Sequence, residues 1–452
     1  MHKVDWENNT KICSLAWNHL YVEITGLVAP CCQYRDPYDG TNGGLLNAKQ
    51  TSIKEAINSE GMKKMRLAML ANQDYSLCSW CDRAEALEIK STRMYKNEEY
   101  LEDTKHLVEK TAPDGSIDTD EFNPLFTDLR FNNLCNLKCR TCSLYASSSW
   151  YDEQKLLTET NVLTGEPTGN KFQVPVKFNN NKLAQETLQY LDSVKHLYWA
   201  GGEPLILPEH YMILNHLIDS GRAKDIQLSY NTNATTTHYK RKPLIEYWKH
   251  FKSVGAFCSL DGIEDVAEYT RTNGKWETFK NTIDTYKKWE FEGLGVSTAQ
   301  PCITISILNI HHLPDYVKYS INNNWMPDDM VMFAINIVDS PDTFSIGLLP
   351  SKEKILISQK LSELYQWLEN ECGNFELPKH IYNTVELRMS EKVTQEAETL
   401  KIQRASLPPD EYNILKKMKQ RLDTYDISAN LNWKKSLPLL ADMFHRYNLL
   451  DN

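Results

Sequence analysis

The sequence has no run of about 18 apolar residues, the length that a membrane-spanning helix needs. Residues 1–7 have no apolar segment after a basic start, so we expect no secretory signal and a cytoplasmic protein. Positive charge is in deficit, because 50 Lys and Arg residues against 60 Asp and Glu residues give a formal net charge of -10. A broad basic surface for nucleic acid or anionic lipid is therefore not expected, which favours a small molecule or a peptide as partner.

A disulfide framework is not expected either, because such frameworks belong to small secreted domains and the cytosol keeps thiols reduced. The eleven cysteines of this 452-residue chain instead suggest metal or cluster ligation. They form two groups and three single residues: Cys13, Cys31, Cys32, Cys78 and Cys81; Cys135, Cys139 and Cys142; and Cys258, Cys302 and Cys372 alone. We expect the single cysteines to be small buried hydrophobic residues.

Six apolar, strand-like runs alternate with helical stretches in the middle of the chain. They cover residues 125–131, 196–200, 226–230, 254–260, 302–310 and 330–338. This alternation predicts an α/β fold in which parallel strands joined by right-handed crossovers curl into a partial or complete barrel. Reactive groups in such folds gather at the C-terminal ends of the strands.

The flanking regions have other patterns. Residues 13–93 are rich in loops, with a strand-like run at 20–24 and a helical stretch at 52–70, and the polar segment that follows is predicted to be a linker. Residues 161–181 are rich in Gly, Pro, Thr and Asn, which indicates an excursion before the second strand. We therefore expect an N-terminal module (1–96), a linker (97–122), a barrel core (123–345) and a C-terminal helical region (346–452).

The C-terminal region has helical periodicity. Four apolar residues repeat on one face before Gly373, which is placed to end the helix: Ile357, Leu361, Leu364 and Leu368. Further helices are predicted over 381–389, 411–422 and 437–447. These helices are expected to cap the barrel or to present a surface to a partner.

The most informative motif is Cys135-x3-Cys139-x2-Cys142, which supplies three thiolates from one loop after a predicted strand. A [4Fe–4S] cluster takes four ligands, so three cysteines would leave one iron open to a small molecule. The alternative is a zinc knuckle, but structural zinc usually takes four protein ligands, and this segment has no fourth nearby. The spacing favours the cluster.

A second motif, Trp199-Ala-Gly-Gly-Glu-Pro204, follows the next predicted strand. Its glycines let a ligand approach the backbone and its carboxylate can accept a hydrogen bond from an ammonium group, although the same residues also suit a plain tight turn. Together and in this order, the two motifs resemble those of the radical S-adenosylmethionine (SAM) superfamily. The resemblance implies a partial (β/α)6 TIM-like barrel.

The resemblance also implies a reaction. The open iron of the cluster held by Cys135, Cys139 and Cys142 would chelate the amino and carboxylate groups of SAM. An electron, delivered by a donor such as flavodoxin or ferredoxin, would then cleave a C–S bond of SAM. The resulting 5′-deoxyadenosyl radical would remove a hydrogen atom from the substrate.

Residues at the strand ends match positions that contact SAM in the superfamily. The resemblance implies that the SAM ammonium is held by Gly201, Gly202, Glu203 and Pro204, and that Asn231 and Asn233 contact SAM from the end of the third strand. Ser259 and Asp261 would meet the ribose and the carboxylate, Arg271 would bind the carboxylate, and Asn309 would lie on the adenosine side. Asn and Ser are also ordinary turn residues at strand ends. Two residues depart from the usual pattern, because Ala234 replaces a glycine and Thr141 replaces an aromatic residue near adenine.

The N-terminal cysteines form a second candidate site. Cys13, the Gly26-x4-Cys31 element and Cys78-x2-Cys81 supply four thiolates, which suit either zinc or an iron–sulfur cluster. The arrangement resembles the twitch domain, a shortened relative of the SPASM domain, and so implies an auxiliary [4Fe–4S] cluster. The module precedes the barrel here, whereas such modules usually follow it. Cys32 is a possible alternative ligand and is more simply interpreted as a spectator.

Four cysteine ligands leave no open iron, which favours electron transfer by the auxiliary cluster over direct binding of substrate. We therefore expect a radical SAM oxidoreductase or modifying enzyme that acts on a peptide or protein side chain or on a small polar metabolite. One alternative is an enzyme that modifies nucleotides or nucleic acid, which the acidic net charge disfavours. A non-catalytic metal-binding adaptor is the other, and the presence of Glu203, Arg271 and all three loop cysteines argues against it.

Overall fold

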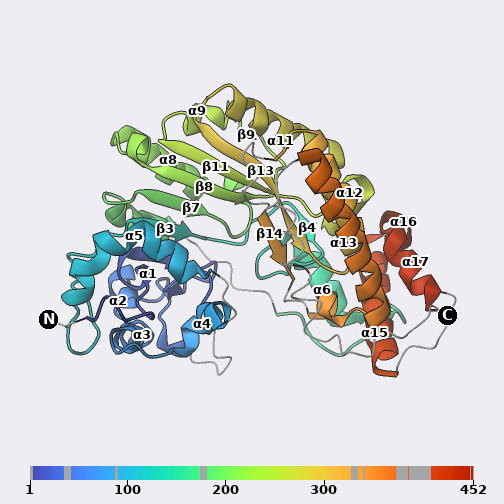
Figure 1. Ribbon diagram of the computed structural model, residues 1–452, viewed down its shortest axis with the longest axis horizontal. Coiled ribbons are helices and arrows are strands. Elements are labelled where there is room, and N and C mark those ends of the chain that lie inside the picture. Colours follow the sequence, from blue (N-terminus) through green and yellow to red (C-terminus); the bar gives the residue numbers. More distant parts are fainter. Residues whose placement is uncertain are drawn as a thin grey trace. The chain divides into compact units, whose positions relative to one another are not determined.

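The computed structural model describes residues 4–34, 42–86, 90–173, 181–326, 334–338, 342–372, 385, 409–447 and 449–450. The fold is α/β with a mostly parallel central sheet, whose strand order is β14-β13-β11-β8-β7-β3-β1-β2 (Figure 1). The strands are β1 (His19–Val22), β2 (Val28–Ala29), β3 (Phe126–Leu129), β7 (His196–Trp199), β8 (Gln227–Thr232), β11 (Ser253–Ser259), β13 (Val296–Ile305) and β14 (Ala334–Ile337). Each of the six predicted apolar runs overlaps one of these strands, so the predicted alternation is confirmed.

The chain divides into two compact units, and β8 and β11 have residues in both. The first unit comprises Met1–Leu134, Val176–Tyr230 and Pro243–Gly255, and the second comprises Cys135–Pro175, Asn231–Lys242 and Ala256–Asn452. Helices of the first unit are α1 (Leu15–Asn18), α2 (Ile53–Ile57), α3 (Glu60–Leu70), α4 (Ser79–Ala86), α5 (Thr92–Glu109), α7 (Asn181–Thr187), α8 (Pro208–Asp219) and α9 (Ile245–Trp248). Among the described residues, none of the helices in either unit combines the length and apolarity needed to cross a membrane.

In the first unit, the strand predicted near residues 20–24 joins the main sheet. Strand β1 pairs in parallel with β3, and β3 pairs in parallel with β7, so that His19, Phe126 and His196 lie side by side. The rings of His19 and Phe126 stack with centroids 4.5 Å apart, and the ring of His196 is tilted against Phe126 with centroids 4.9 Å apart. The N-terminal cysteine region thus contributes a strand to the sheet that contains the first predicted barrel strand.

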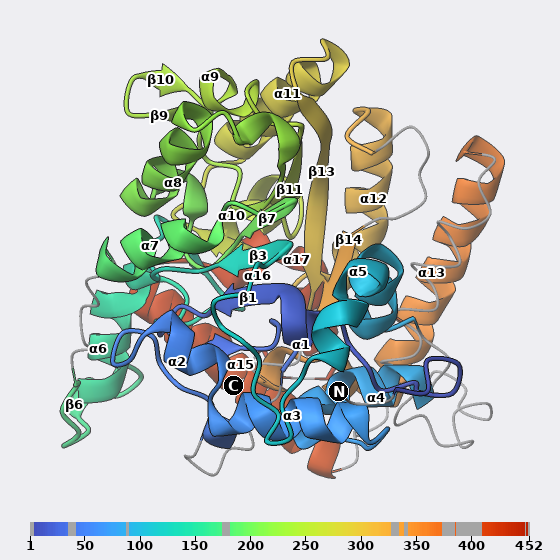
Figure 2. The same cartoon turned by 90° about the vertical axis from the view of Figure 1, so that its left-hand side faces the viewer.

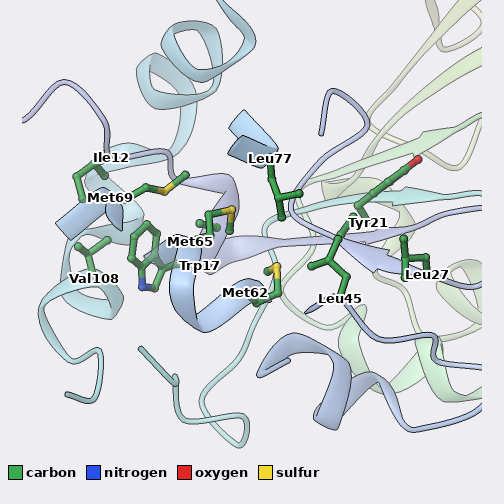
Figure 3. Packing of buried hydrophobic residues seen from close by; sticks show 12 residues of the cluster. Ile12, Trp17, Tyr21, Leu27, Leu45, Met62, Met65, Met69, Leu77 and Val108 are labelled. Atoms are coloured by element: carbon green, nitrogen blue, oxygen red, sulfur yellow. The ribbon is translucent and has the colours of Figure 1, made fainter. Parts of the chain in front are cut away.

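Helices α1 to α4 lie together on one side of β1 (Figure 2). Trp17 of α1 and Met65 and Met69 of α3 belong to one apolar core, which Figure 3 shows from close by. The predicted helix over 52–70 is interrupted near Asn58 and Ser59, and α2 begins with a capping box formed by Ser52 and Glu55.

Helix α5 differs from the prediction. Residues from 97 onward were expected to form a linker, but the chain is helical to Glu109. The side chain of Ser91 caps the first turn, and Tyr100, Thr104 and Val108 are buried at intervals of four residues along one face. The remaining residues of the helix are largely polar, and this polarity concealed the narrow buried face in the sequence.

The second unit contains the other helices and three small sheets. Its helices are α6 (Tyr151–Glu159), α10 (Glu264–Thr270), α11 (Trp276–Phe291), α12 (Leu313–Asn322), α13 (Ser351–Cys372), α15 (Pro409–Ala429), α16 (Trp433–Ser436) and α17 (Pro438–Arg446). Its small strands are β4 (Lys138–Cys139) paired with β12 (Arg271–Thr272), β5 (Thr160–Asn161) paired with β6 (Glu166–Pro167), and β9 (His238–Tyr239) paired with β10 (Lys242–Pro243), of which Pro243 belongs to the first unit. The β5–β6 hairpin lies in the predicted excursion.

Helix α13 has the predicted apolar face, because all four residues that define it are buried: Ile357, Leu361, Leu364 and Leu368. Helix α15 covers the predicted run at 411–422, and α17 lies within the predicted run at 437–447. The predicted stop at Gly373 and the run at 381–389, apart from Val385, lie outside the described residues.

Two buried histidines make the first unit sensitive to acid. His19 Nδ1 lies 2.9 Å from the carbonyl oxygen of Pro30, and His210 Nε2 lies 2.9 Å from the hydroxyl of Tyr230. Burial lowers the pKa of each imidazole to about 3. In the unfolded chain each of these imidazoles has a pKa of about 6.5. Below that pH the unfolded state therefore binds more protons than the folded state.

We therefore expect the free energy of unfolding to fall as the pH drops from about 6.5 towards about 4, by up to roughly 1.4 kcal/mol per pH unit for each histidine. Urea denaturation at a series of pH values checks this. A His210→Gln variant should show a shallower decline than the parent protein. Equal stability at neutral and acidic pH would contradict the prediction.

Candidate functional site

The three-cysteine loop is held by a short antiparallel pair in the second unit. Strand β4 contains Cys139 and pairs with β12, so that Arg271 lies directly opposite Cys139. The backbone N–H of Cys142 donates to the carbonyl oxygen of Cys139 at 2.9 Å, which closes the turn between the second and third cysteines. All three cysteines are half-buried. The structure thus places Cys135, Cys139 and Cys142 on one compact loop.

Hydrogen-bond donors point at two of the three sulfur atoms. Arg271 Nη1 lies 3.6 Å from Cys139 Sγ, and Asn233 Nδ2 lies 3.8 Å from Cys135 Sγ. Burial raises the pKa of the Cys139 thiol to about 12 and that of Cys142 to about 11, so both thiols hold their protons in the metal-free chain. A cluster would displace these protons, and the donors would then stabilise the thiolates. The donor set therefore fits an iron–sulfur cluster.

Arg271 is itself fixed by a buried carboxylate. Its Nη2 lies 2.9 Å from Asp261 Oδ2, and both side chains are almost inaccessible to solvent. Asp261 Oδ1 also accepts a hydrogen bond from the backbone of Thr304 at 2.9 Å. Asp261 thus orients Arg271 towards the cysteine loop and ties it to the end of β13.

The other predicted strand-end residues have different surroundings. Asn309 is buried, and its amide donates to the carbonyl oxygens of Asp261 and Thr304, both at 2.9 Å. Its side-chain oxygen accepts from the backbone N–H of Ser306 at 2.8 Å. Asn309 therefore joins the ends of β11 and β13, and its assignment to adenosine stays a prediction. Asn231 and Ser259 are half-buried in β8 and β11.

The glycine motif lies in the first unit and packs on the chain just after β3. The backbone N–H of Gly202 donates to Asn132 O at 3.3 Å, and that of Glu203 donates to Leu134 O at 2.7 Å. Gly201 has φ of 110°, and a Cβ on Gly202 would lie only 2.2 Å from Leu134 O. Both positions therefore require glycine, for conformational and steric reasons respectively.

Glu203 follows these glycines and is fully buried. Its Oε1 accepts from the backbone N–H of Leu205 at 3.0 Å and caps the short turn that begins at Pro204. The carboxylate is thus rigidly placed at the end of β7. The sequence motif identified the position, and the structure adds the local hydrogen bonds that hold it.

Ala234, which stands where superfamily members usually have glycine, adopts φ of 54°. This left-handed conformation is unfavourable for alanine and ordinary for glycine. We expect Ala234→Gly to raise the free energy of unfolding by up to about 1 kcal/mol, because the lost strain outweighs the added flexibility of the unfolded chain. Chemical denaturation checks this. Ala256→Gly in β11 is the control and should lower the free energy of unfolding. A destabilised Ala234→Gly protein would contradict the prediction.

The N-terminal cysteines form the second candidate site, in the first unit. One cavity is lined by all four predicted ligands together with apolar side chains, Gln33 and Arg93. The four are Cys13, Cys31, Cys78 and Cys81. Cys32 is exposed and is not among the lining residues. The structure thus separates Cys32 from the four cysteines that the sequence singled out.

Three of the four thiols in this cavity are weakly acidic. Burial raises the pKa of Cys13 to about 12 and those of Cys31 and Cys78 well above their usual range. Among the residues that the structure describes, no three thiol, imidazole or carboxylate groups are grouped closely enough to hold one metal ion.

Arg93 is a charged neighbour of this cavity that the sequence did not reveal. Its side chain is only 4% exposed and pairs with Asp82 at 2.7 Å and with Glu85 at 2.6 Å. These carboxylates hold a guanidinium group beside four thiols. No spacing in the sequence distinguishes Arg93 from the other basic residues of α5.

Two of the single cysteines behave as expected. Cys258 and Cys302 are buried, and Cys302 Sγ lies 3.3 Å from Asn336 Nδ2. The side chain of Cys372 lies outside the described residues.

Comparison with known proteins gives two family matches. Residues 129–308 match the radical SAM superfamily, and residues 13–83 match the SPASM iron–sulfur cluster-binding domain. No curated protein matches the sequence.

Several solved structures are similar to the chain at low identity. Native anSMEcpe with bound AdoMet is 13% identical, with 55% of this chain and 62% of that chain covered and a TM-score of 0.36. Streptococcus suis SuiB bound to S-adenosylmethionine is 15% identical, with 72% and 64% covered and a TM-score of 0.36. SuiB bound to the precursor peptide SuiA is 14% identical, with 72% and 66% covered and the same TM-score. The chain therefore spans less than two thirds of the length of each.

Proposed function

Because the chain carries a radical SAM domain and a SPASM iron–sulfur cluster-binding domain, we propose that it is an enzyme that cleaves SAM and abstracts a hydrogen atom from its substrate. One observation carries the proposal. Within the matched radical SAM region, the three-cysteine loop is paired with β12, and Arg271 donates to Cys139 Sγ. The loop therefore has both the ligands and a fixed positive charge beside them.

In this proposal, Cys135, Cys139 and Cys142 hold a [4Fe–4S] cluster with one iron left for SAM. When bound, the reduced cluster supplies the electron that cleaves a C–S bond of SAM to give a 5′-deoxyadenosyl radical. Arg271 binds the SAM carboxylate as a charge-assisted donor, and Asp261 keeps its guanidinium in place. Gly201 to Pro204 accommodate the SAM ammonium at the end of β7.

The proposed architecture is a partial (β/α)6 barrel over 123–345 built on β3, β7, β8, β11, β13 and β14. The twitch module over 1–96 precedes it, residues 97–122 connect the two, and the helices of 346–452 form an extension. The parallel pairing of β3 with β7, β7 with β8 and β13 with β14 supports this arrangement.

The auxiliary cluster would take all four cysteines of the N-terminal cavity and have no open iron. Its role is then to accept or pass on the electron left after hydrogen abstraction, and Arg93 would stabilise its more negative reduced state. A flavodoxin or ferredoxin would supply the first electron. The net charge of -10 favours a peptide side chain or a small polar metabolite over nucleic acid as substrate.

Anaerobic reconstitution with iron and sulfide, followed by dithionite and SAM, tests the proposal. We expect 5′-deoxyadenosine from the parent protein and from a Cys258→Ala control, and none from a Cys142→Ala variant. Absence of 5′-deoxyadenosine from a fully loaded parent protein would rule out the enzyme and favour a metal-binding adaptor.

A further inference from the structure

Glu153 joins the cysteine loop to the C-terminal helices within the second unit. This carboxylate lies on α6 and is almost completely buried, with a side chain only 2% exposed. It pairs with Lys138 Nζ at 2.8 Å and with Arg140 Nη1 at 3.0 Å. These two cations flank Cys139 in the sequence. One buried carboxylate thus holds both neighbours of the central cysteine of the loop.

Arg140 depends on Glu153 for its counter-charge. Its side chain is fully buried, and Nε and Nη2 have no hydrogen-bond partner among the described residues. The guanidinium instead lies among three aromatic rings, with its carbon 5.4 Å, 5.8 Å and 5.1 Å from the ring centroids of Trp150, Tyr269 and Tyr425. Among the described residues Glu153 is the carboxylate that forms an ion pair with Arg140, so removing its charge would leave this buried cation without its direct partner.

Helix α15 completes the enclosure from the far end of the sequence. Ser428 Oγ donates to Glu153 Oε1 at 2.7 Å, and Tyr425 supplies one of the rings around Arg140. Asp426 accepts from Tyr269 Oη at 3.1 Å and from the backbone N–H of Trp433 at 2.6 Å. Figure 1 labels α15 beside α6 in this unit, and the two helices are in contact.

The contacts of α15 reach residues next to both strands of the β4–β12 pair. Arg140 directly follows Cys139, and its backbone N–H donates to Thr270 O at 2.8 Å. Tyr269, which Asp426 holds, lies two residues before Arg271. Helix α15 therefore contacts the segments that carry Cys139 and Arg271 at the same time.

We propose that Glu153 and α15 are positioning elements for SAM binding at the primary cluster. The inference rests on the proposed function and deepens it. Glu153 fixes β4 and the two cations beside Cys139, and Asp426 fixes the segment that leads to Arg271. Helix α15 therefore acts on the reaction through the cysteine loop, in addition to any role as a cap or partner surface.

The proposal is tested with the Glu153→Gln variant as full-length protein, reconstituted anaerobically. The matched control is Asp152→Asn, because Asp152 is the exposed neighbour on the same helix. Ser428→Ala is the milder variant, and Thr424→Ala, whose hydroxyl bonds only within α15, is its control. The readout is the change that SAM causes in the electron paramagnetic resonance spectrum of the reduced protein, measured at equal iron load. A purely structural contribution would change iron load or folding without changing this response.

We expect Glu153→Gln to lose most of the SAM-induced change in the spectrum and Glu153→Asp to restore part of it. Ser428→Ala should weaken SAM binding about tenfold, as expected for losing a hydrogen bond to a buried charge. Both controls should match the parent protein. A parental SAM response in Ser428→Ala overturns the proposal, even if Glu153→Gln fails to fold. If the parent protein itself shows no SAM response, the proposed function fails rather than this inference alone.

Discussion

Replacing Gly202 by alanine is expected to lower SAM cleavage at least about 100-fold. The added Cβ would lie 2.2 Å from Leu134 O and 2.8 Å from the carbonyl carbons of Asn133 and Leu134. These are backbone atoms, so the clash cannot be relieved by rotating a side chain, and the glycine motif must move away from the end of β3. Quantifying 5′-deoxyadenosine under anaerobic conditions measures the effect.

Gly221→Ala is the control for this substitution. Gly221 has φ of 72° and open space where a Cβ would stand, so alanine there costs conformational strain of about 1 kcal/mol without a clash. We expect Gly221→Ala to keep the parental rate. Full activity in Gly202→Ala, with the iron load unchanged, would show that the motif does not bind SAM.

Replacing Arg271 by methionine is expected to destabilise the protein by about 3–5 kcal/mol and to abolish SAM cleavage. The substitution leaves the carboxylate of Asp261 buried and unpaired, and it removes the donor to Cys139 Sγ. Chemical denaturation reports the first effect and SAM cleavage the second.

A double variant separates the two effects. Arg271→Met with Asp261→Asn removes the unpaired charge and keeps an oxygen that can accept from the backbone of Thr304. We expect this protein to regain much of its stability and to remain inactive. Recovery of SAM cleavage together with stability would assign Arg271 a structural role only.

The six strands of the predicted alternation could be recognised in the sequence because each overlaps an apolar run between helical stretches. The position of β1 in the sheet could not be predicted, because an apolar run such as residues 20–24 does not specify the strand with which it pairs. Its pairing with β3 depends on contacts between residues about a hundred positions apart, such as Tyr21 and Asp128. The domain boundaries suggested from composition stay predictions.

The candidate site was predictable to the extent that its residues form local motifs. The cysteine loop and the glycine motif have short, specific spacings, and the structure supplies the contacts that hold them. Asn309 could be recognised as a strand-end residue. The sequence did not reveal that its side-chain oxygen and nitrogen both form hydrogen bonds with the backbone. The hydrogen bond between Glu153 and Ser428 joins residues 275 positions apart, and no sequence pattern in either segment predicts it.

The measurement that tests the central claim most directly is the iron content of two variants reconstituted in parallel. With Cys135, Cys139 and Cys142 replaced by alanine, about four irons per chain should remain in the N-terminal cavity and SAM cleavage should be absent. With Cys13, Cys31, Cys78 and Cys81 replaced instead, about four irons should remain in the loop. Zinc in either site, or iron lost from both sites in both variants while the chain stays folded, would contradict two separate clusters.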